Sequence, residues 1–550
     1  MPRFDRFATL PYMPNRLSLL FPVLLIFSGL ASAADSPVGS CAGFRQLKLP
    51  DVTITTAENI AAGKFTPPNL KAGEALPPIF QSAPAFCRVT ATLAPTPDSD
   101  IKLEVWLPAE HWNGKFRGVG NGGFGGYINY PELAAAVRLG YAAASTDTGH
   151  STEGGGQWAL GHPEKFVDYG YRAIHEMTVN AKTIAHEFYG AAPQKSYFSS
   201  CSNGGRQALM EAQRFPDDYD GIIAGAPANA WVPMLTAGLQ MLQHTEGPGY
   251  ISAAKIPVIS QAVLAACDSQ DGLKDGILND PRQCHFDPST LLCKGTSSDA
   301  CLSQPQVDSL KQIYAGGHDA SGKPIFPGLL PGAEEGQGGW EPWITGDAPG
   351  KSLADFYVLG FFTNMVYGDK DWDFRKANID ASLKLATEKA ADTMNANNAD
   401  LKAFRAHGGK LILYHGWNDP AISSLNTIDY YNRVIAALGN DSVQQFVRLY
   451  MVPGMQHCMG GQGATVFGQA ADLQRAEGDT GPDRDIFTAL VQWVESGQAP
   501  GKLIASRYRE DDPAKGVQMT RPLCIYPQSA KYNGSGDPDR ASSFTCSLGK

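Results

Sequence analysis

Two short segments of this chain each place a cysteine next to a side chain that can take part in nucleophilic catalysis. The first is SSCSNGGRQ, with Cys201 and Ser202, and the second is PGMQHCMGG, with His457 and Cys458. Because a disulfide holds its two Cα atoms within about 4.4–6.8 Å, a Cys201–Cys458 bond would bring Ser202 and His457 together. Two weak local motifs would then form one stronger candidate site.

The N-terminus has the pattern of a secretory signal peptide. A flank with three arginines precedes the apolar run at 17–30, and the A-x-A sequence at 31–33 predicts cleavage after Ala33. An uncleaved anchor is the alternative, but Pro22 and the short run disfavour it, because crossing a bilayer takes about 18–20 apolar residues. No other segment suggests a membrane span. We expect residues 1–33 to be a signal peptide and the protein to be secreted or periplasmic.

All ten cysteines lie beyond the predicted cleavage site. In an exported chain this favours disulfides over metal thiolates, and the absence of a CxxC pair weakens the zinc and thioredoxin interpretations. Spacing favours three local pairs and leaves two longer ones, although spacing alone does not fix the connectivity. The resulting pairs are Cys267–Cys284, Cys293–Cys301, Cys524–Cys546, Cys41–Cys87 and Cys201–Cys458.

Composition indicates a large globular chain with more than one domain. It has 550 residues, of which 43% are hydrophobic and 18% charged. The net charge of −10, from 45 basic and 55 acidic residues, argues against a phosphate-binding surface. We expect no nucleic-acid partner and no membrane association after cleavage, and the sequence leaves the oligomeric state open.

From about residue 100 the chain alternates short apolar runs with helical patterns, which predicts a parallel sheet covered by helices. LEVWLP, FRGV and YAAAS are strand-like, and residues 171–190 show helical spacing that ends at Gly190, a residue suited to a C-cap. The alternation stops near residue 228 and resumes with KLILYHGWND. We therefore predict an α/β fold with a catalytic domain at 34–228 and 399–550 and an inserted lid domain at 229–398.

Ser202 lies between a predicted strand and a helix that opens with Gly204 and Gly205. A nucleophile on such a tight turn exposes its hydroxyl, and small neighbours allow the turn to form. Ser200 replaces the first glycine of the Gly-x-Ser-x-Gly pattern, so the motif is only partly met. A serine N-cap is the alternative interpretation.

Asp419 and His457 each follow a predicted strand, so the chain has the order Ser202, Asp419, His457 that α/β-hydrolase triads share. His457 would accept the serine proton, and Asp419 would fix the imidazole tautomer. Taken alone, the histidine could be structural and the aspartate a turn residue. His415 is the rival base; because no cysteine adjoins it, we interpret it as a pocket or supporting residue that binds substrate.

The glycine-rich segment GVGNGGFGG at 118–126 follows an early strand, where α/β-hydrolases place an oxyanion donor. We predict the Gly123 N–H as this donor, with Gly122 as the alternative, and the Asn203 N–H as the second. A flexible turn is the other interpretation. A phosphate-binding loop is excluded because no Lys-Ser/Thr follows.

The segment CDSQDGLKDGILND carries several carboxylates between Cys267 and Cys284. Oxygen-rich, glycine-bent loops suit Ca²⁺, although the spacing is not that of an EF-hand. A solvated acidic loop is the alternative. The ion would be structural, because the loop lies far in sequence from the triad, and its predicted ligands are the side chains of Asp268, Asp271 and Asp275 with the carbonyls of Leu273 and Ile277.

Aromatic residues are concentrated in the predicted insert, where they either wall a pocket for a planar aromatic acid or form a core. We expect two or three to contact substrate and choose Trp343 and Phe361. The full set is Trp340, Trp343, Phe356, Phe361, Phe362, Tyr367 and Trp372.

From about Cys41 to its end the chain resembles the tannase and feruloyl esterase family, which includes mono(2-hydroxyethyl) terephthalate hydrolase. The shared marks are CSNGG, NDP, QHC, DSQDGLKDGI and ten cysteines in compatible order. The resemblance implies an α/β-hydrolase with an inserted lid, a disulfide between the neighbours of the catalytic Ser202 and His457, and a structural Ca²⁺ in the lid.

The same resemblance implies a serine esterase that forms an acyl-enzyme with feruloyl or galloyl esters, including esters attached to plant polymers. The terephthalate-type enzyme would hold a second carboxylate with a lid arginine, and no arginine occurs between Arg282 and Arg375, which disfavours terephthalate or phthalate monoesters. A general lipase or peptidase and a non-catalytic Ca²⁺-dependent binding protein are the remaining alternatives.

Overall fold

The structure, a computed structural model, describes residues 40–548 except residues 72, 297, 333, 472, 474, 477 and 478. The signal peptide predicted at 1–33 lies outside the described residues. All described residues belong to one compact unit.

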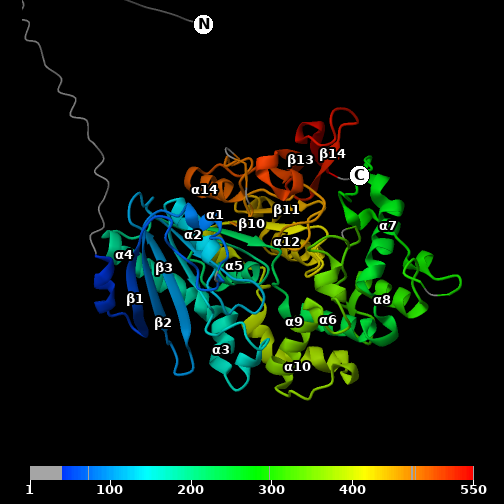
Figure 1. The fold of residues 1–550 in the computed structure, drawn as a ribbon, viewed down its shortest axis with the longest axis horizontal. Coiled ribbons are helices and arrows are strands. Elements are labelled where there is room, and N and C mark those ends of the chain that lie inside the picture. Colours follow the sequence, from blue (N-terminus) through cyan, green and yellow to red (C-terminus); the bar gives the residue numbers. More distant parts are fainter. Residues whose placement is uncertain are drawn as a thin grey trace, which may run out of the picture. The chain divides into compact units, whose positions relative to one another are not determined.

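A nine-stranded sheet runs through the described part of the chain (Figure 1). Strands β1 to β3 are antiparallel to their neighbours, whereas the strands from β5 to β11 pair in parallel. In spatial order the strands are β1 (Val52–Ile60), β2 (Phe86–Leu93), β3 (Ile101–Pro108), β5 (Ala142–Thr146), β4 (Lys115–Val119), β6 (Lys195–Cys201), β7 (Gly221–Gly225), β10 (Lys410–Gly416) and β11 (Val447–Val452).

Helices cover both faces of this sheet because its central strands are apolar on both sides. Ile222 faces one core cluster and Ile223 the other, as expected for side chains that alternate along a strand. The first cluster includes α4 (Ala173–Tyr189), α5 (Asn203–Arg214) and α12 (Ser424–Leu438), and the second includes α2 (Tyr130–Arg138) and α14 (Ile486–Ser496). The predicted α/β-hydrolase fold class is confirmed.

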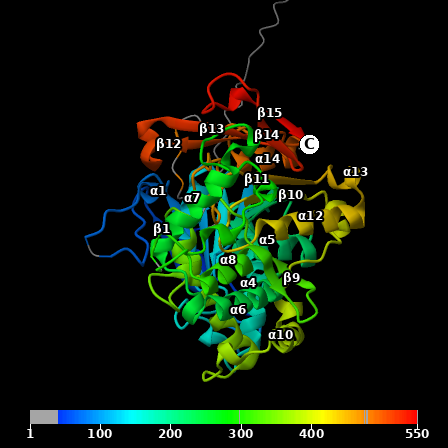
Figure 2. The same ribbon diagram turned by 90° about the vertical axis from the view of Figure 1, so that its right-hand side faces the viewer.

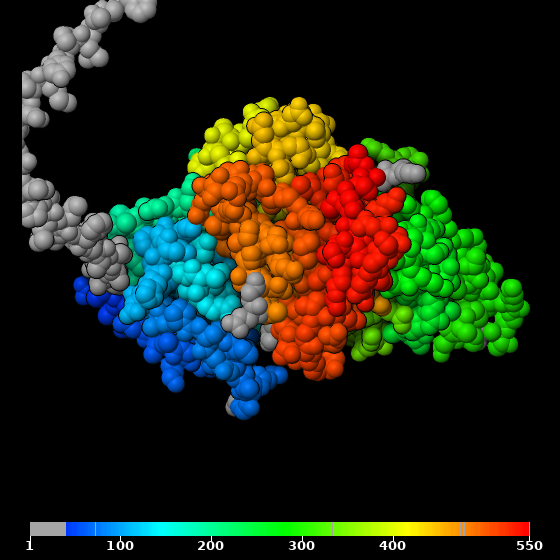
Figure 3. All heavy atoms as spheres, turned by 90° about the horizontal axis from the view of Figure 1, so that it is seen from above, coloured from blue at the N-terminus to red at the C-terminus, as the bar shows by residue number. Residues whose placement is uncertain are grey.

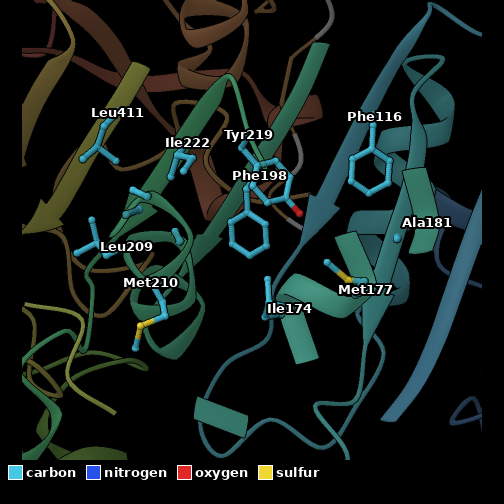
Figure 4. Close-up of a cluster of buried hydrophobic side chains, with 14 of the residues drawn as sticks. Phe116, Ile174, Met177, Ala181, Phe198, Leu209, Met210, Tyr219, Ile222 and Leu411 are labelled. Atoms are coloured by element: carbon cyan, nitrogen blue, oxygen red, sulfur yellow. The ribbon is translucent and has the colours of Figure 1, made fainter. Parts of the chain in front are cut away.

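Helix α4 illustrates how the sequence pattern produces the packing. Ile174, Met177 and Ala181 recur at helical spacing and face the sheet in Figure 4, close to Phe198. The helix ends at Gly190, whose φ of 70° suits glycine and whose N–H donates to the His186 carbonyl. The predicted helix and its C-cap are therefore present.

The segment between β7 and β10 adds no strand to the nine-stranded sheet among the described residues; β8 (Gly316–His318) and β9 (Pro324–Pro327) pair with each other. Its side chains form one apolar cluster of their own and share a second with Phe124, Tyr169 and Ile422, and Figure 1 shows its helices grouped away from β1 to β3. The division at residues 229 and 398 stays a prediction. The helices are α6 (Trp231–Thr245), α7 (Ile256–Cys267), α8 (Gln304–Ala315), α9 (Leu353–Gly360), α10 (Ile379–Met394) and α11 (Lys402–His407).

One helical segment of the described residues, Gly247–Asp271, is long and apolar enough to cross a membrane by length and composition, which the sequence analysis did not anticipate. It consists of α7 with short 3₁₀ turns at both ends. Ile256, Ile259 and Val263 of α7 lie in a core cluster with Leu310 of α8. The apolar face of this segment therefore packs inside the insert.

The residues after β11 form two small antiparallel sheets near α14 (Figure 2). In the space-filling view these residues make a continuous orange-to-red surface beside the green insert (Figure 3). Their strands are β12 (Leu503–Tyr508), β13 (Val517–Leu523), β14 (Gln528–Tyr532) and β15 (Phe544–Leu548). The short helices α1 (Pro78–Gln81), α3 (Pro163–Val167) and α13 (Asn440–Val443) complete the set named in Figures 1 and 2.

Five disulfides join the ten cysteines, in the pairs that spacing favoured. Four close loops of 8 to 46 residues in sequence separation, and the fifth, Cys201–Cys458, spans 257 residues with a Cα–Cα distance of 6.0 Å. That bond links the end of β6 to the loop after β11, and so connects two distant parts of the sheet.

Candidate active site

Ser202 occupies the tight turn between β6 and α5 with a φ of 67°, which is rare for a residue other than glycine. The small neighbours predicted for this turn are required: a Cβ at Gly204 would collide with Ser200 Oγ, and one at Gly205 with the Gly225 carbonyl. Ser200 thus occupies the position of the usual first glycine without disturbing the turn. The result is a hydroxyl presented at the carboxyl end of the sheet.

The structure brings Ser202, His457 and Asp419 into one hydrogen-bonded chain. His457 Nε2 lies 2.8 Å from Ser202 Oγ, and His457 Nδ1 lies 2.7 Å from Asp419 Oδ2. Because a carboxylate only accepts hydrogen bonds, Nδ1 carries the imidazole proton and Nε2 accepts from the serine hydroxyl. This is the arrangement in which a histidine can withdraw a proton from serine.

Asp419 is fully buried and held by several donors. Its Oδ1 accepts from the N–H groups of Ala421 and Ile422 at 2.8 and 2.9 Å, and its Oδ2 also lies 3.1 Å from His415 Nε2. Burial alone would raise the pKa of Asp419, but His457 and His415 together lower it below its ordinary value. The carboxylate is therefore ionised at neutral pH and can orient His457.

His415 does not reach the cavity, so the expectation that it binds substrate is not met. Its side chain is fully buried, its Nε2 also faces the Ile422 carbonyl at 3.1 Å, and its Nδ1 lies 2.7 Å from Thr427 Oγ1. It is not a rival base either, because it contacts Asp419 and not Ser202. Its position at the end of β10 brings it next to Asp419 and away from Ser202.

The predicted oxyanion residues flank Ser202. In the glycine-rich loop the Gly122 N–H donates to Tyr127 Oη at 2.7 Å, whereas no hydrogen bond is recorded for the Gly123 N–H within the described residues. Gly123 has a φ of 58°, and a Cβ there would lie 2.5 Å from Tyr357 Oη. Asn203, the first residue of α5, offers its N–H at the start of the helix.

A cavity of about 980 Å³ opens over these residues, at the upper end of the roughly 300–1,000 Å³ usual for small-molecule sites. Ser202, His457, Gly123 and Trp343 all line it. The Trp343 ring lies edge-to-face on His457 with centroids 4.8 Å apart. No lysine or arginine lines the cavity among the described residues.

The aromatic residues of the insert divide into two groups. Trp343 and Phe356 line the cavity, whereas Phe361 is fully buried in the core of the insert against Trp231 and Phe362, so its predicted substrate contact is wrong. Tyr357 lines the cavity between Trp343 and Phe124 and was missed by the sequence analysis. Its position next to Phe356 in an aromatic run was the available signal.

Residues 328–340 of the insert accept hydrogen bonds from both loops that carry Asp419 and His457. Ser423 Oγ donates to the Gly328 carbonyl at 2.6 Å, and Asn418 Nδ2 to the Pro331 carbonyl at 2.8 Å. On the other loop, Gln456 Nε2 donates to the Glu335 carbonyl at 2.7 Å. These bonds attach the insert to Asn418 directly before Asp419, to Ser423 four residues after it and to Gln456 directly before His457.

The predicted calcium ligands lie in the loop that follows α7. Asp271 Oδ1 accepts from the Leu273 N–H, Asp268 from the Gly276 N–H and Asp275 from the Ile277 N–H. Burial raises the pKa of Asp271, and the carboxylates of Asp275 and Asp268 raise it further.

Three carboxylates in one loop provide the oxygen ligands that a hard cation needs. They repel one another, and Arg521 pairs with Asp275 at 2.8 Å. The carboxylate oxygens of these three residues do not all lie within 4.8 Å of one another. Among the described residues, the group whose possible metal-binding atoms lie that close together is His175, Glu211 and Asp218. Besides the Asp275–Arg521 pair, the loop contributes Ile277 to the core cluster that includes Met455, and Ile277 lies next to Gly454 in the loop that leads to His457.

Comparison with known proteins agrees with this geometry. The family model described as "Tannase and feruloyl esterase" matches residues 87–547. An uncharacterized esterase of Xanthomonas campestris pv. campestris is 42% identical over 97% of this chain and 95% of its own length, and a probable feruloyl esterase B-2 of Aspergillus fumigatus is 32% identical over 97% and 100%. The crystal structure of feruloyl esterase B from Aspergillus oryzae superposes with a TM-score of 0.82 at 28% identity, covering 92% of this chain and 99% of that one.

The fold, the aligned length and the identity to named esterases agree with one another. The α/β sheet carries Ser202 at its carboxyl edge within hydrogen-bond distance of His457, and the family model covers the sheet from β2 onward together with the insert. The chain therefore belongs to the tannase and feruloyl esterase family and is a carboxylic ester hydrolase.

Proposed function

We propose that this protein hydrolyses esters of aromatic acids, with feruloyl and related hydroxycinnamoyl esters as its first substrate class and galloyl esters as the second. The observation that carries the proposal is the Ser202–His457–Asp419 chain at the floor of a cavity walled by Trp343 and Tyr357. Planar aromatic acids suit such walls because aromatic rings pack face to face or edge to face. The proposed order of feruloyl before galloyl esters is supported by relatives that are named feruloyl esterase B.

The proposed reaction proceeds through an acyl-enzyme. His457 Nε2 takes the Ser202 proton as Oγ attacks the ester carbonyl, and the same proton passes to the departing alcohol. The N–H groups of Gly123 and Asn203 stabilise the negative oxygen of the tetrahedral intermediate. Water activated by His457 then attacks the acyl group. The carboxylic acid is released, and Ser202 regains its proton from His457.

Substrates with a second carboxylate are disfavoured. A terephthalate or phthalate monoester needs a cation to hold that carboxylate, and the described cavity lining contains Glu74 and Glu132 but no lysine or arginine. A second substrate carboxylate would be repelled by these glutamates, whereas the neutral esters of phenolic acids carry no such charge. The expected order of turnover is therefore feruloyl ester, then galloyl ester, then terephthalate monoester.

We also propose a structural Ca²⁺ held by the carboxylates of Asp268, Asp271 and Asp275 with the carbonyls of Leu273 and Ile277. A bound divalent cation would relieve the repulsion among the three carboxylates. Export to a secreted or periplasmic location is proposed as well, because the five disulfides suit an oxidising compartment and the N-terminal pattern suits a signal peptide.

The test is hydrolysis of methyl ferulate, methyl gallate and a terephthalate monoester by the purified protein and by Ser202→Ala. We expect turnover of methyl ferulate by the wild type and a loss of at least about 10³-fold in the variant. Undiminished hydrolysis by Ser202→Ala would show that another residue is the nucleophile. A preference for the terephthalate monoester would overturn the proposed substrate class.

A further inference from the structure

Arg206 is a fully buried cation on α5, one helical turn after Ser202, and no carboxylate pairs with it among the described residues. Its Nε donates to Asn203 Oδ1 at 2.8 Å, and its Nη1 and Nη2 donate to the carbonyls of Gly170 and Tyr169 at 2.7 and 3.1 Å. Burial lowers its pKa from the ordinary 12.5, yet arginine remains protonated in proteins. Burying an unpaired charge is costly, so its retention calls for an explanation.

The residues that hold this guanidinium also build the proposed oxyanion hole. Asn203, which accepts the Arg206 Nε–H, provides one of the two backbone donors. Tyr169 is fully buried, lies under the guanidinium at 5.1 Å, and its Oη is 3.2 Å from Asn203 Oδ1 and 2.9 Å from the Gly123 carbonyl oxygen. Arg206 and Tyr169 thus contact both residues whose N–H groups would receive the developing charge.

We propose that Arg206 is a positioning residue of the oxyanion hole whose missing counter-charge is the transient negative oxygen of the tetrahedral intermediate. The inference rests on the proposed Ser202 mechanism. In the resting enzyme the partners of the guanidinium among the described residues are the Asn203 side-chain oxygen, backbone carbonyls and the faces of Tyr169 and Trp231, all of them uncharged. Attack by Ser202 creates a negative oxygen beside the Asn203 N–H, and charges interact more strongly inside a protein than in bulk water.

This role makes a prediction that a purely structural arginine would not make. An interaction that strengthens only when the negative oxygen forms raises kcat and leaves ground-state binding unchanged. A structural arginine, which would also fasten α5 to α10 through the Met394 carbonyl at 3.5 Å, would damage binding and catalysis together. The split between kcat and KM separates the two roles.

The experiment compares the wild type with Arg206→Lys and Arg206→Gln, using methyl ferulate for kinetics and two inhibitors for binding. One is an aryl boronic acid, whose adduct with serine is tetrahedral and negatively charged, and the other is ferulic amide, which is neutral. We expect Arg206→Gln to lose about 10- to 100-fold in kcat and in boronate affinity, with KM and amide affinity within about two-fold, and Arg206→Lys to recover most of both. Equal losses of boronate and amide affinity, or a lysine variant as impaired as the glutamine variant, would overturn the proposal.

A second pair of variants tests the charge while Arg206 stays in place, in case Arg206→Gln fails to fold. Thr393 is partly exposed and lies against Gly170, whose carbonyl binds the guanidinium. Thr393→Glu should place a carboxylate near Arg206 and lower kcat and boronate affinity, whereas Thr393→Gln, of the same size, should not. Equal kcat in these two variants would contradict a role for the buried charge.

Failure of the proposed function would look different. If the wild type and Ser202→Ala hydrolysed methyl ferulate equally well, Ser202 would not be the nucleophile. That result would contradict the proposed function independently of the Arg206 variants. With the Ser202 requirement established, the kcat and boronate results bear on Arg206 alone.

Discussion

His415 donates its Nε2–H to Asp419 Oδ2, the oxygen that also accepts the Nδ1–H hydrogen bond of His457. The aspartate is therefore held from behind by a histidine that never meets the substrate. We expect His415→Gln to lower kcat by about 10-fold with little change in KM, because the carboxylate loses a donor that fixes its position. Steady-state kinetics on methyl ferulate measure this, with exposed His186→Gln as the control; unchanged kcat would contradict it.

Trp343 and Phe361 form a matched pair for testing which aromatic residues bind substrate. Trp343→Ala should raise KM for methyl ferulate about 10-fold and leave the melting temperature nearly unchanged, because Trp343 lines the cavity. Phe361→Ala should cost about 3–5 kcal/mol of folding free energy and leave KM unchanged in the protein that folds. Thermal unfolding and steady-state kinetics together decide; the reverse pattern would mean that the two roles are exchanged.

The Cys201–Cys458 bond should matter for activity more than for folding. The double variant Cys201→Ser/Cys458→Ser removes the link between the nucleophile turn and the His457 loop, so we expect activity to fall by 100-fold or so while most of the fold remains. The control is Cys293→Ser/Cys301→Ser, which opens a disulfide of sequence separation 8 in the insert. Ester hydrolysis and circular dichroism are the measurements, and equal activity in the two double variants would refute the expected difference.

Removal of calcium should weaken the His457 loop through Ile277, whose Cγ2 would lie 3.3 Å from a Cβ at Gly454. Treatment with EGTA is expected to lower the melting temperature and kcat together, and added Ca²⁺ to restore both. Asp271→Asn should mimic the treatment and respond less to Ca²⁺, whereas Asp287→Asn, in an exposed turn outside the loop, should behave like the wild type. A melting temperature insensitive to EGTA would speak against a structural ion.

Glu211 gives a pH-dependent prediction. Burial raises the pKa of Glu211 well above the ordinary 4.5, and the neighbouring carboxylate of Asp218 raises it further. The folded protein therefore keeps the carboxyl protonated while the unfolded chain ionises it, and its stability falls as pH rises above about 4.5.

Glu211→Gln removes this ionisation. Relative to the wild type, the variant should become more stable by about 1.4 kcal/mol per pH unit above pH 4.5, for as long as the folded group keeps its proton. Denaturant unfolding between pH 4 and 8 measures the difference, with exposed Glu187→Gln on α4 as the control. A difference that does not grow with pH would show that Glu211 is ionised in the folded state.

Much of the fold followed from periodicity. The alternation of strand-like and helical segments predicted a parallel sheet, in which Ile222 and Ile223 of β7 do face opposite core clusters, and Gly190 marked the end of α4 correctly. The order of Ser202, Asp419 and His457 placed three side chains at strand ends, and the carboxyl ends of parallel strands share one edge of the sheet.

Contacts made across the insert were beyond such reasoning. Trp343 and Phe361 are both aromatic residues of one segment, but Phe361 begins a π-helical turn, Phe361–Tyr367, that directs it into the core. The importance of Arg206 and Tyr169 was equally hidden, because their partners come from segments that are far apart in the sequence, including Gly123, Trp231 and Met394. Periodicity records which face of an element is apolar and not which distant backbone groups will lie opposite a polar side chain.

The hydrogen bonds between residues 328–340 and the Asp419 and His457 loops limit how the insert can be redesigned. Because the backbone of that segment accepts bonds from Ser423, Asn418 and Gln456, the insert is part of the catalytic frame and not a detachable cover. Exchanging the whole insert with that of a relative would disturb the acid and base at the same time as the pocket. Variation confined to Trp343, Phe356 and Tyr357 would reshape the pocket wall and leave those three bonds in place.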